Sequence, residues 1–148
     1  MALLLAVIRP DSWNLALFLH VLGATVLFGS AATIAIVGFA GRAGRGHEQL
    51  LARVALGTFL LAVIPAWIAM RVGAGWIEGK EFPGGANEPG WVGVGFIVSE
   101  GTGVLLLVTG ILAWLSVRRG RLMLAVPLIA SLCVIAYAVA WVAMSGKP

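Results

Sequence analysis

The chain has 148 residues, of which 61% are hydrophobic and only 11% are charged, and its mean hydropathy is +1.04. This composition argues against a water-soluble globule and indicates an integral membrane protein, because the sequence has room for four apolar stretches of the roughly 20 residues that a span needs. The net charge of +4 does not indicate a nucleic-acid partner, because most arginines flank the apolar stretches and leave little for a basic binding surface.

The first two apolar stretches are predicted to form a pair of membrane helices. We expect spans over residues 13–40 and 50–76, joined by the turn GRAGRGHEQ, which is rich in glycine and arginine. Pro65 lies inside the second span, where proline usually produces a kink. The loop that follows, from Gly79 to Gly90, carries more acidic than basic residues, which is typical of the outer face.

The second pair of spans is predicted over residues 91–117 and 122–144, with the basic turn RRGR at residues 118–121 between them. Because arginines concentrate in cytoplasmic turns, both Arg-rich turns are expected inside. The sequence therefore predicts an all-α, integral membrane four-helix bundle, a single domain over residues 1–148, with both termini outside. Tryptophans at the four expected outer ends support this orientation, since they form interfacial belts: Trp13, Trp76, Trp91 and Trp141.

The third span contains one carboxylate, Glu100, within an almost unbroken apolar run. A charge in hydrocarbon costs about 2.5–3.5 kcal/mol even on lenient scales, so we expect Glu100 to face the bundle interior and to have a partner there. Small residues share roughly one side of the same span, and we expect the backbone of another helix to approach them closely: Gly95, Ser99, Gly103 and Gly110.

One polar residue from each span lies at a similar depth below the expected outer tryptophans, roughly 6–13 Å at the helical rise: His20, Arg71, Glu100 and Tyr137. We predict that they form a buried polar cluster in the outer half of the bilayer. Arg71 is expected to pair with Glu100, and His20 to form hydrogen bonds with Glu100 and Tyr137. Two simpler interpretations stay open, namely that Arg71 extends to the interface and that Tyr137 is a belt or packing residue.

A metal or cofactor is not the leading expectation. The second histidine, His47, lies in the opposite turn, so two histidines cannot clamp one haem iron. A haem or copper ion on His20, completed by another ligand, remains the alternative. Patterns of zinc proteases, nucleotide-binding loops and nucleophilic triads are absent from the sequence, so catalytic residues stay unknown.

The segment FLHVLGA, from Phe18 to Ala24, with Gly29 after it, resembles the first helix of a family of small bacterial four-helix membrane proteins classed as a domain of unknown function. The basic turn and the proline of the second helix, Pro65, are also similar. Related-looking first helices occur in copper-resistance D-type membrane proteins and in the membrane protoporphyrinogen oxidase family. The latter resemblance implies haem binding by His20, but that family pairs its histidine with a lysine on a later helix, and this chain has no intramembrane lysine.

The expected function is that of a small bacterial inner-membrane protein acting as an interaction module or accessory subunit. Its expected partners are the lipid bilayer and either another membrane protein or further copies of itself, with no nucleic acid. The competing class is a redox or metal-handling protein that uses His20. A third class, a proton or small-solute carrier that uses Glu100, would need oligomerisation to provide a pathway.

Overall fold

The computed structural model describes residues 11–43, 47–85 and 89–145, and over these residues all regular secondary structure is helical. The long elements are α2 (Asn14–Ala43), α3 (Glu48–Thr58), α4 (Ile64–Glu81), α5 (Gly90–Arg119) and α6 (Ala125–Ser145). A π-helical segment, η2 (Phe59–Val63), joins α3 to α4 in one continuous helix, and η1 (Asp11–Trp13) and η3 (Pro83–Gly85) are short 3-10 turns. The described chain thus has four helices long and apolar enough to cross a membrane, which confirms the predicted helical class.

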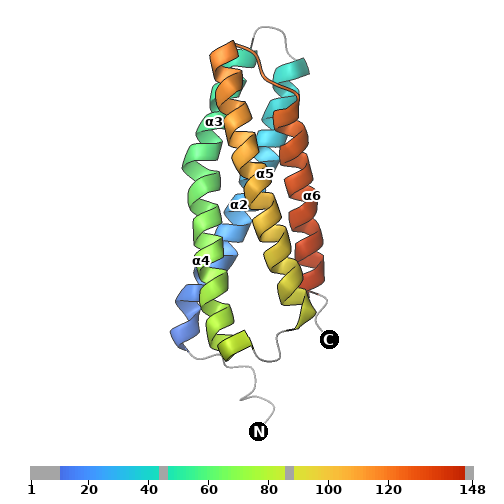
Figure 1. The fold of residues 1–148 in the computed structure, drawn as a ribbon. Helices are drawn as coiled ribbons and strands as arrows, with labels where there is room; N and C mark the ends of the chain where they lie inside the picture. The colour runs from blue at the N-terminus through green and yellow to red at the C-terminus, as the bar shows by residue number, and fades with distance from the viewer. Residues whose placement is uncertain (1–10, 44–46, 86–88, 146–148) are drawn as a thin grey trace.

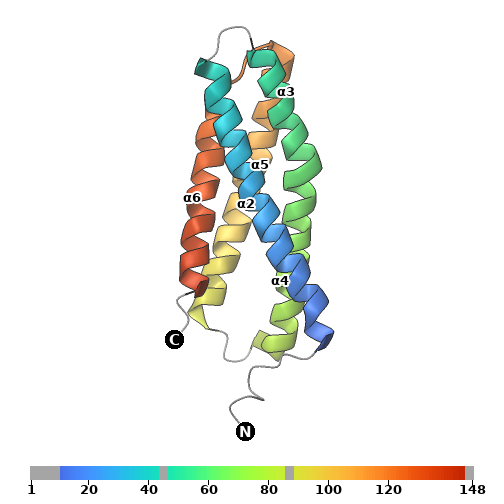
Figure 2. The same ribbon diagram turned by 180° about the vertical axis from the view of Figure 1, so that it is seen from behind.

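The four helices form an elongated antiparallel bundle (Figures 1 and 2). Helix α2 packs against α3 and α4 on one side and against α6 on the other, and α5 packs against α3 and α6. The beginning of α2 and the end of α6 lie at the same end of the bundle (Figure 1). Toward that end α4 and α5 separate and make little backbone contact (Figures 1 and 2). This separation positions the candidate site described below.

The apolar residues divide between a tightly packed interior and an equally apolar exterior. Leu27, Ile34 and Val126 are almost completely buried. In contrast, Leu61 and Ile97 are 83% and 75% exposed on the outside of the bundle. An exterior this apolar would be unfavourable in water and is suited to lipid, so the four helices indicate a membrane protein.

Two local features differ from the predicted spans. The fourth helix begins at Ala125 and not at residue 122, because residues before it form hydrogen bonds with α2 and α5. The carbonyl oxygen of Leu122 accepts a hydrogen bond from Arg42 Nη1 at 3.2 Å, and the amide of Met123 donates to Ser116 Oγ at 3.0 Å. The backbone groups of Leu122 and Met123 therefore have hydrogen-bond partners although these residues are not helical.

The predicted effect of Pro65 takes the form of a change in helical pitch. Proline has no amide proton to donate and its ring crowds the preceding turn. Just before it, the amide of Ile64 donates to the carbonyl of Phe59, five residues earlier, as in a π-helix. The wider turn accommodates the proline while the helix continues.

Candidate functional site

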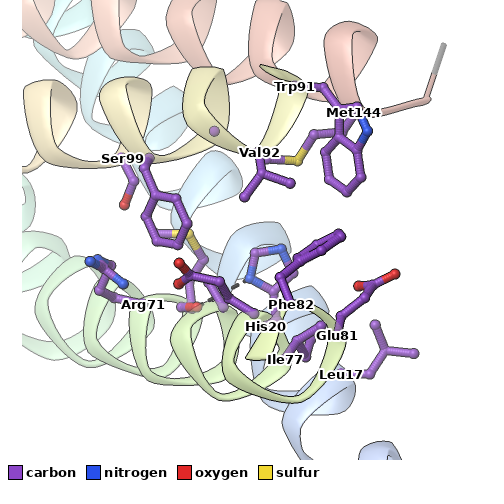
Figure 3. Close-up of a pocket in the computed structure, with 15 residues that line it drawn as sticks. Leu17, His20, Arg71, Ile77, Glu81, Phe82, Trp91, Val92, Ser99 and Met144 are labelled. Atoms are coloured by element: carbon purple, nitrogen blue, oxygen red, sulfur yellow. Dashed lines mark hydrogen bonds between the residues drawn. The ribbon is translucent and has the colours of Figure 1, made fainter. Parts of the chain in front are cut away.

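Close contact between α2 and α4 positions the ring of His20. A Cβ atom added to Gly23 would collide with the backbone of Ala66 and Met70, and one added to Gly73 would collide with the backbone of Ala16 and His20. The two helices therefore touch backbone to backbone through these glycines. His20 is held beside α4, where its Nδ1 lies 3.1 Å from the carbonyl oxygen of Met70 (Figure 3).

This contact determines which nitrogen of His20 carries a proton. A carbonyl oxygen can only accept, so Nδ1 is the donor, and in the neutral imidazole Nε2 keeps a free lone pair. Among the described residues, Nε2 has no hydrogen bond. The prediction that Glu100 and Tyr137 satisfy His20 is wrong, because the glycine contact brings a backbone carbonyl of α4 to the ring.

Arg71 and Glu100 form the predicted ion pair, with 2.7 Å between Arg71 Nε and Glu100 Oε1. The guanidinium of Arg71 also lies over the ring of Phe96, 4.6 Å from its centroid. The pair is not interior, however, because the side chains are 33% and 57% exposed. The prediction that Glu100 faces the bundle interior is wrong, since α4 and α5 separate here and the pair bridges them at the surface.

The small residues of α5 do not receive another backbone as expected. A Cβ on Gly95 would meet Met144, one on Gly103 would meet Trp67, and one on Gly110 would meet Phe59. Large side chains therefore fill the space beside α5, and Trp67 Nε1 also donates to the carbonyl oxygen of Ser99 at 3.3 Å. The backbone contact lies instead at Gly23 and Gly73. A sequence signal for it exists, because small residues recur every seven positions at Ala16, Gly23 and Ser30, and again at Ala66 and Gly73.

Two adjoining hollows lie where α4 and α5 separate. The larger, of about 330 Å³, is enclosed mainly by α2, α5 and α6, and the smaller, of about 200 Å³, mainly by α2, α4 and α5 (Figure 3). Both are lined by residues that converge from all four helices: His20, Met70, Gly95, Ser99 and Met144. His20 and Tyr137 thus share the larger hollow and His20 and Arg71 the smaller, whereas Glu100 lines neither.

Among the described residues, Ser99 Oγ and the hydroxyl of Tyr137 are buried at the larger hollow without a hydrogen-bond partner. Ser99 is 7% exposed. Thr102 lies near Tyr137 but forms no hydrogen bond with its hydroxyl, and the Thr102 hydroxyl donates to the carbonyl oxygens of Val98 and Ser99. Ser99, which the sequence indicated only as a packing residue, is therefore a polar group of the site.

The site has few side chains that could coordinate a metal ion. In the described part of the chain, no three His, Cys, Asp or Glu side chains come together in a way that could hold one. His47 directly precedes α3, at the end of the bundle opposite to His20. A haem or copper ion would depend on Nε2 of His20, with the thioethers of Met70 and Met144 as the soft donors on the same walls. The haem or copper alternative stays a prediction.

No protein-family model matches the chain, and no curated protein or solved structure shows significant similarity to it. The resemblance of the first helix to known families therefore stays a prediction, and the site is interpreted from its geometry.

Proposed function

We propose that the protein is a small bacterial inner-membrane accessory subunit that binds a transmembrane helix of another protein on the face formed by α4 and α5. The observation that carries this proposal is the position of the Arg71–Glu100 pair. Glu100 is 57% exposed on the outside of a helix that is apolar enough to span a membrane.

The depth of Glu100 makes this exposure unusual. It lies ten residues from the start of the 30-residue helix α5 at Gly90, or roughly 15 Å along a helix about 45 Å long, so a hydrocarbon layer about 30 Å thick centred on the helix would include it. Charged side chains at such a depth nearly always face protein or a water-filled cavity. Arg71 occupies one carboxylate oxygen of Glu100, and the exposed side of the pair needs a cover that the described part of the chain does not provide.

The surroundings of Glu100 are suited to another helix. Ile97 and Val104, on the same side of α5, are 75% and 63% exposed. Gly101 is also exposed, and a Cβ placed on it would meet nothing within 4 Å, so an approaching helix could come close. The expected occupant is an apolar helix that brings a hydroxyl, amide or cationic donor to the level of Glu100.

The test measures the size and composition of the complex formed by the tagged full chain, extracted from its native membrane in mild detergent. The wild type is expected to elute with one partner at fixed stoichiometry, and Glu100→Gln and Val104→Trp to lose that partner. Leu132→Trp is the matched control, because Leu132 is 53% exposed on α6, away from this face.

A wild type that elutes alone, or a Val104→Trp variant that keeps its partner, would rule out the proposed face. Co-elution of two differently tagged copies, disrupted by Val104→Trp, would replace the foreign partner with a second copy of the chain.

A further inference from the structure

We propose that the larger hollow binds an uncharged, lipid-soluble ring compound with oxygen substituents, of the quinone or quinol class. The hollow lies among α2, α5 and α6, and Glu100 is not among its lining residues. The inference is therefore independent of the partner helix proposed for the α4–α5 face.

Three polar groups of the larger hollow are free to form hydrogen bonds with a ligand. The hydroxyls of Ser99 and Tyr137 can each donate or accept, and Nε2 of neutral His20 can accept, because its Nδ1 is already committed to Met70. Buried hydroxyls without partners cost free energy, so native structures rarely retain them without a ligand or ordered water. The carbonyl oxygens of a quinone could accept from the two hydroxyls, and a hydroxyl of a quinol could also donate to Nε2 of His20.

The rest of the wall is apolar and aromatic, which selects against water as the filler. Phe28 and Trp141 meet edge to face, with 6.4 Å between ring centroids and 78° between planes, and Leu27 and Val98 are among the other apolar residues of the lining. The volume of about 330 Å³ would hold several waters at ~30 Å³ each, and most of them would face apolar side chains without polar partners. An aromatic ring would instead pack against Phe28 and Trp141.

Charge and size narrow the class of ligand. The described residues that line the larger hollow include no Asp, Glu, Lys or Arg, so nothing would compensate a charged head group. The volume is at the lower end of the range for small-molecule sites, about 300–1,000 Å³, which fits one substituted ring better than a porphyrin. The smaller hollow shares His20, Ser99 and Met144 as walls and offers additional room for substituents.

The test titrates decylubiquinone into the purified full chain in detergent and follows quenching of tryptophan fluorescence, with Trp141 in the wall as a reporter. Saturable binding is expected for the wild type. Ser99→Ala and Tyr137→Phe should each weaken the affinity by about 3–10-fold, the effect of one lost hydrogen bond. Neither should lower the thermal midpoint, because neither deleted hydroxyl has a hydrogen-bond partner among the described residues.

Ser131→Ala is the matched control, because the Ser131 hydroxyl donates to the carbonyl of Pro127 on α6 and lies outside the hollow. It should leave the affinity unchanged. Ala24→Phe, which adds a ring to the wall without removing a polar group, should abolish binding.

Three results would overturn the inference. These are the absence of saturable binding by the wild type, wild-type affinity in both Ser99→Ala and Tyr137→Phe, and a Soret band in the purified protein that disappears in His20→Ala. None of them affects the partner face, whose variants Glu100→Gln and Val104→Trp lie outside the hollow.

Discussion

The guanidinium of Arg71 and the carboxylate of Glu100 stabilise each other on the outside of helices apolar enough to cross a membrane, where either charge alone would be costly. A single charge on the outside of a span costs about 2.5–3.5 kcal/mol, and replacing both charges removes that cost. We therefore expect Arg71→Gln and Glu100→Gln each to lower the free energy of unfolding more than the double variant does. Denaturation of the reconstituted protein in bicelles measures all three.

Effects of the two single substitutions that simply add in the double variant would contradict this coupling. Glu81→Gln serves as the control, because Glu81 is exposed in the last turn of α4 and should change the free energy of unfolding by less than about 0.5 kcal/mol.

The role of His20 distinguishes an accessory subunit without a metal from a redox or metal-handling protein. If it is a hydrogen-bonded histidine without a metal, His20→Ala removes the bond to the Met70 carbonyl and loosens the contact between α2 and α4, with no change in the visible spectrum. Loss of one partly buried hydrogen bond should cost about 0.5–1.5 kcal/mol. Protein purified after growth with haem and copper provides the measurement. A Soret band or stoichiometric copper that is abolished by His20→Ala would favour the redox alternative.

The residues of the site differ in how far the sequence could predict their contacts. Arg71 and Glu100 lie on consecutive helices at a similar depth and carry opposite charges, so their pairing was predictable. The bond from His20 to Met70 was not, because the acceptor is a backbone carbonyl that becomes available only where Gly23 and Gly73 let the helices touch. The exposure of Glu100 was also unpredictable, since it depends on how far α4 and α5 separate.

At the scale of the elements, glycines of α2 and its neighbours fall into two groups that the structure distinguishes. A Cβ on Gly23 or Gly73 would collide with backbone atoms, which cannot move aside as a flexible side chain could. We expect Gly23→Ala and Gly73→Ala to lower the free energy of unfolding by about 1–3 kcal/mol through overpacking. Because Gly73 lies against His20 and Gly23 against Met70, and both contacted residues line the larger hollow, both substitutions should also weaken decylubiquinone binding.

Gly29 and Gly57 are the matched controls, since a Cβ on either would meet nothing within 4 Å. Alanine there should leave the protein as stable or stabilise it by up to about 1 kcal/mol through helix propensity. If alanine changed the free energy of unfolding equally at all four glycines, the backbones of α2 and α4 would not be in direct contact.

The helices themselves were predictable to within a few residues, because long apolar stretches interrupted by glycine and arginine leave few alternatives. Pro65 predicted an irregularity but not its form, since proline is compatible with a kink or with a π-helical segment. The late start of α6 escaped prediction because it depends on tertiary bonds, namely those from Arg42 to Leu122 and from Met123 to Ser116.

At the scale of the whole molecule, composition predicted the four long apolar helices but not the site. The hollows exist because α4 and α5 diverge at one end while α3 and α5 pack at the other. Hydropathy does not encode this divergence, because the facing residues other than Arg71 and Glu100 are mostly apolar in either arrangement. The distribution of arginines between the two ends of the bundle, in contrast, can be read from the sequence and predicts the orientation in the membrane.

The two ends of the bundle differ in charge, which predicts its orientation. Arginines concentrate at the end formed by the α2–α3 and α5–α6 turns: Arg42, Arg53, Arg118, Arg119 and Arg121. Arg45, assigned to the same turn from the sequence, lies outside the described residues. The other end carries Glu78, Lys80 and Glu81 at the end of α4. Basic residues in short loops are retained in the cytoplasm, so the arginine end should be inside and both termini outside.

Reporter fusions after Ala43, Gly84 and Gly120 test this orientation in the turns themselves. A reporter active only in the periplasm should be active after Gly84 and inactive after Ala43 and Gly120, and a cytoplasmic reporter should give the opposite pattern. Replacing Arg118, Arg119 and Arg121 with glutamine should reduce this bias, because it removes three of the charges that retain the second turn. Periplasmic activity after Ala43 or Gly120 in the wild type would mean that the bundle is inverted, and Glu100 would then lie in the inner half of the bilayer.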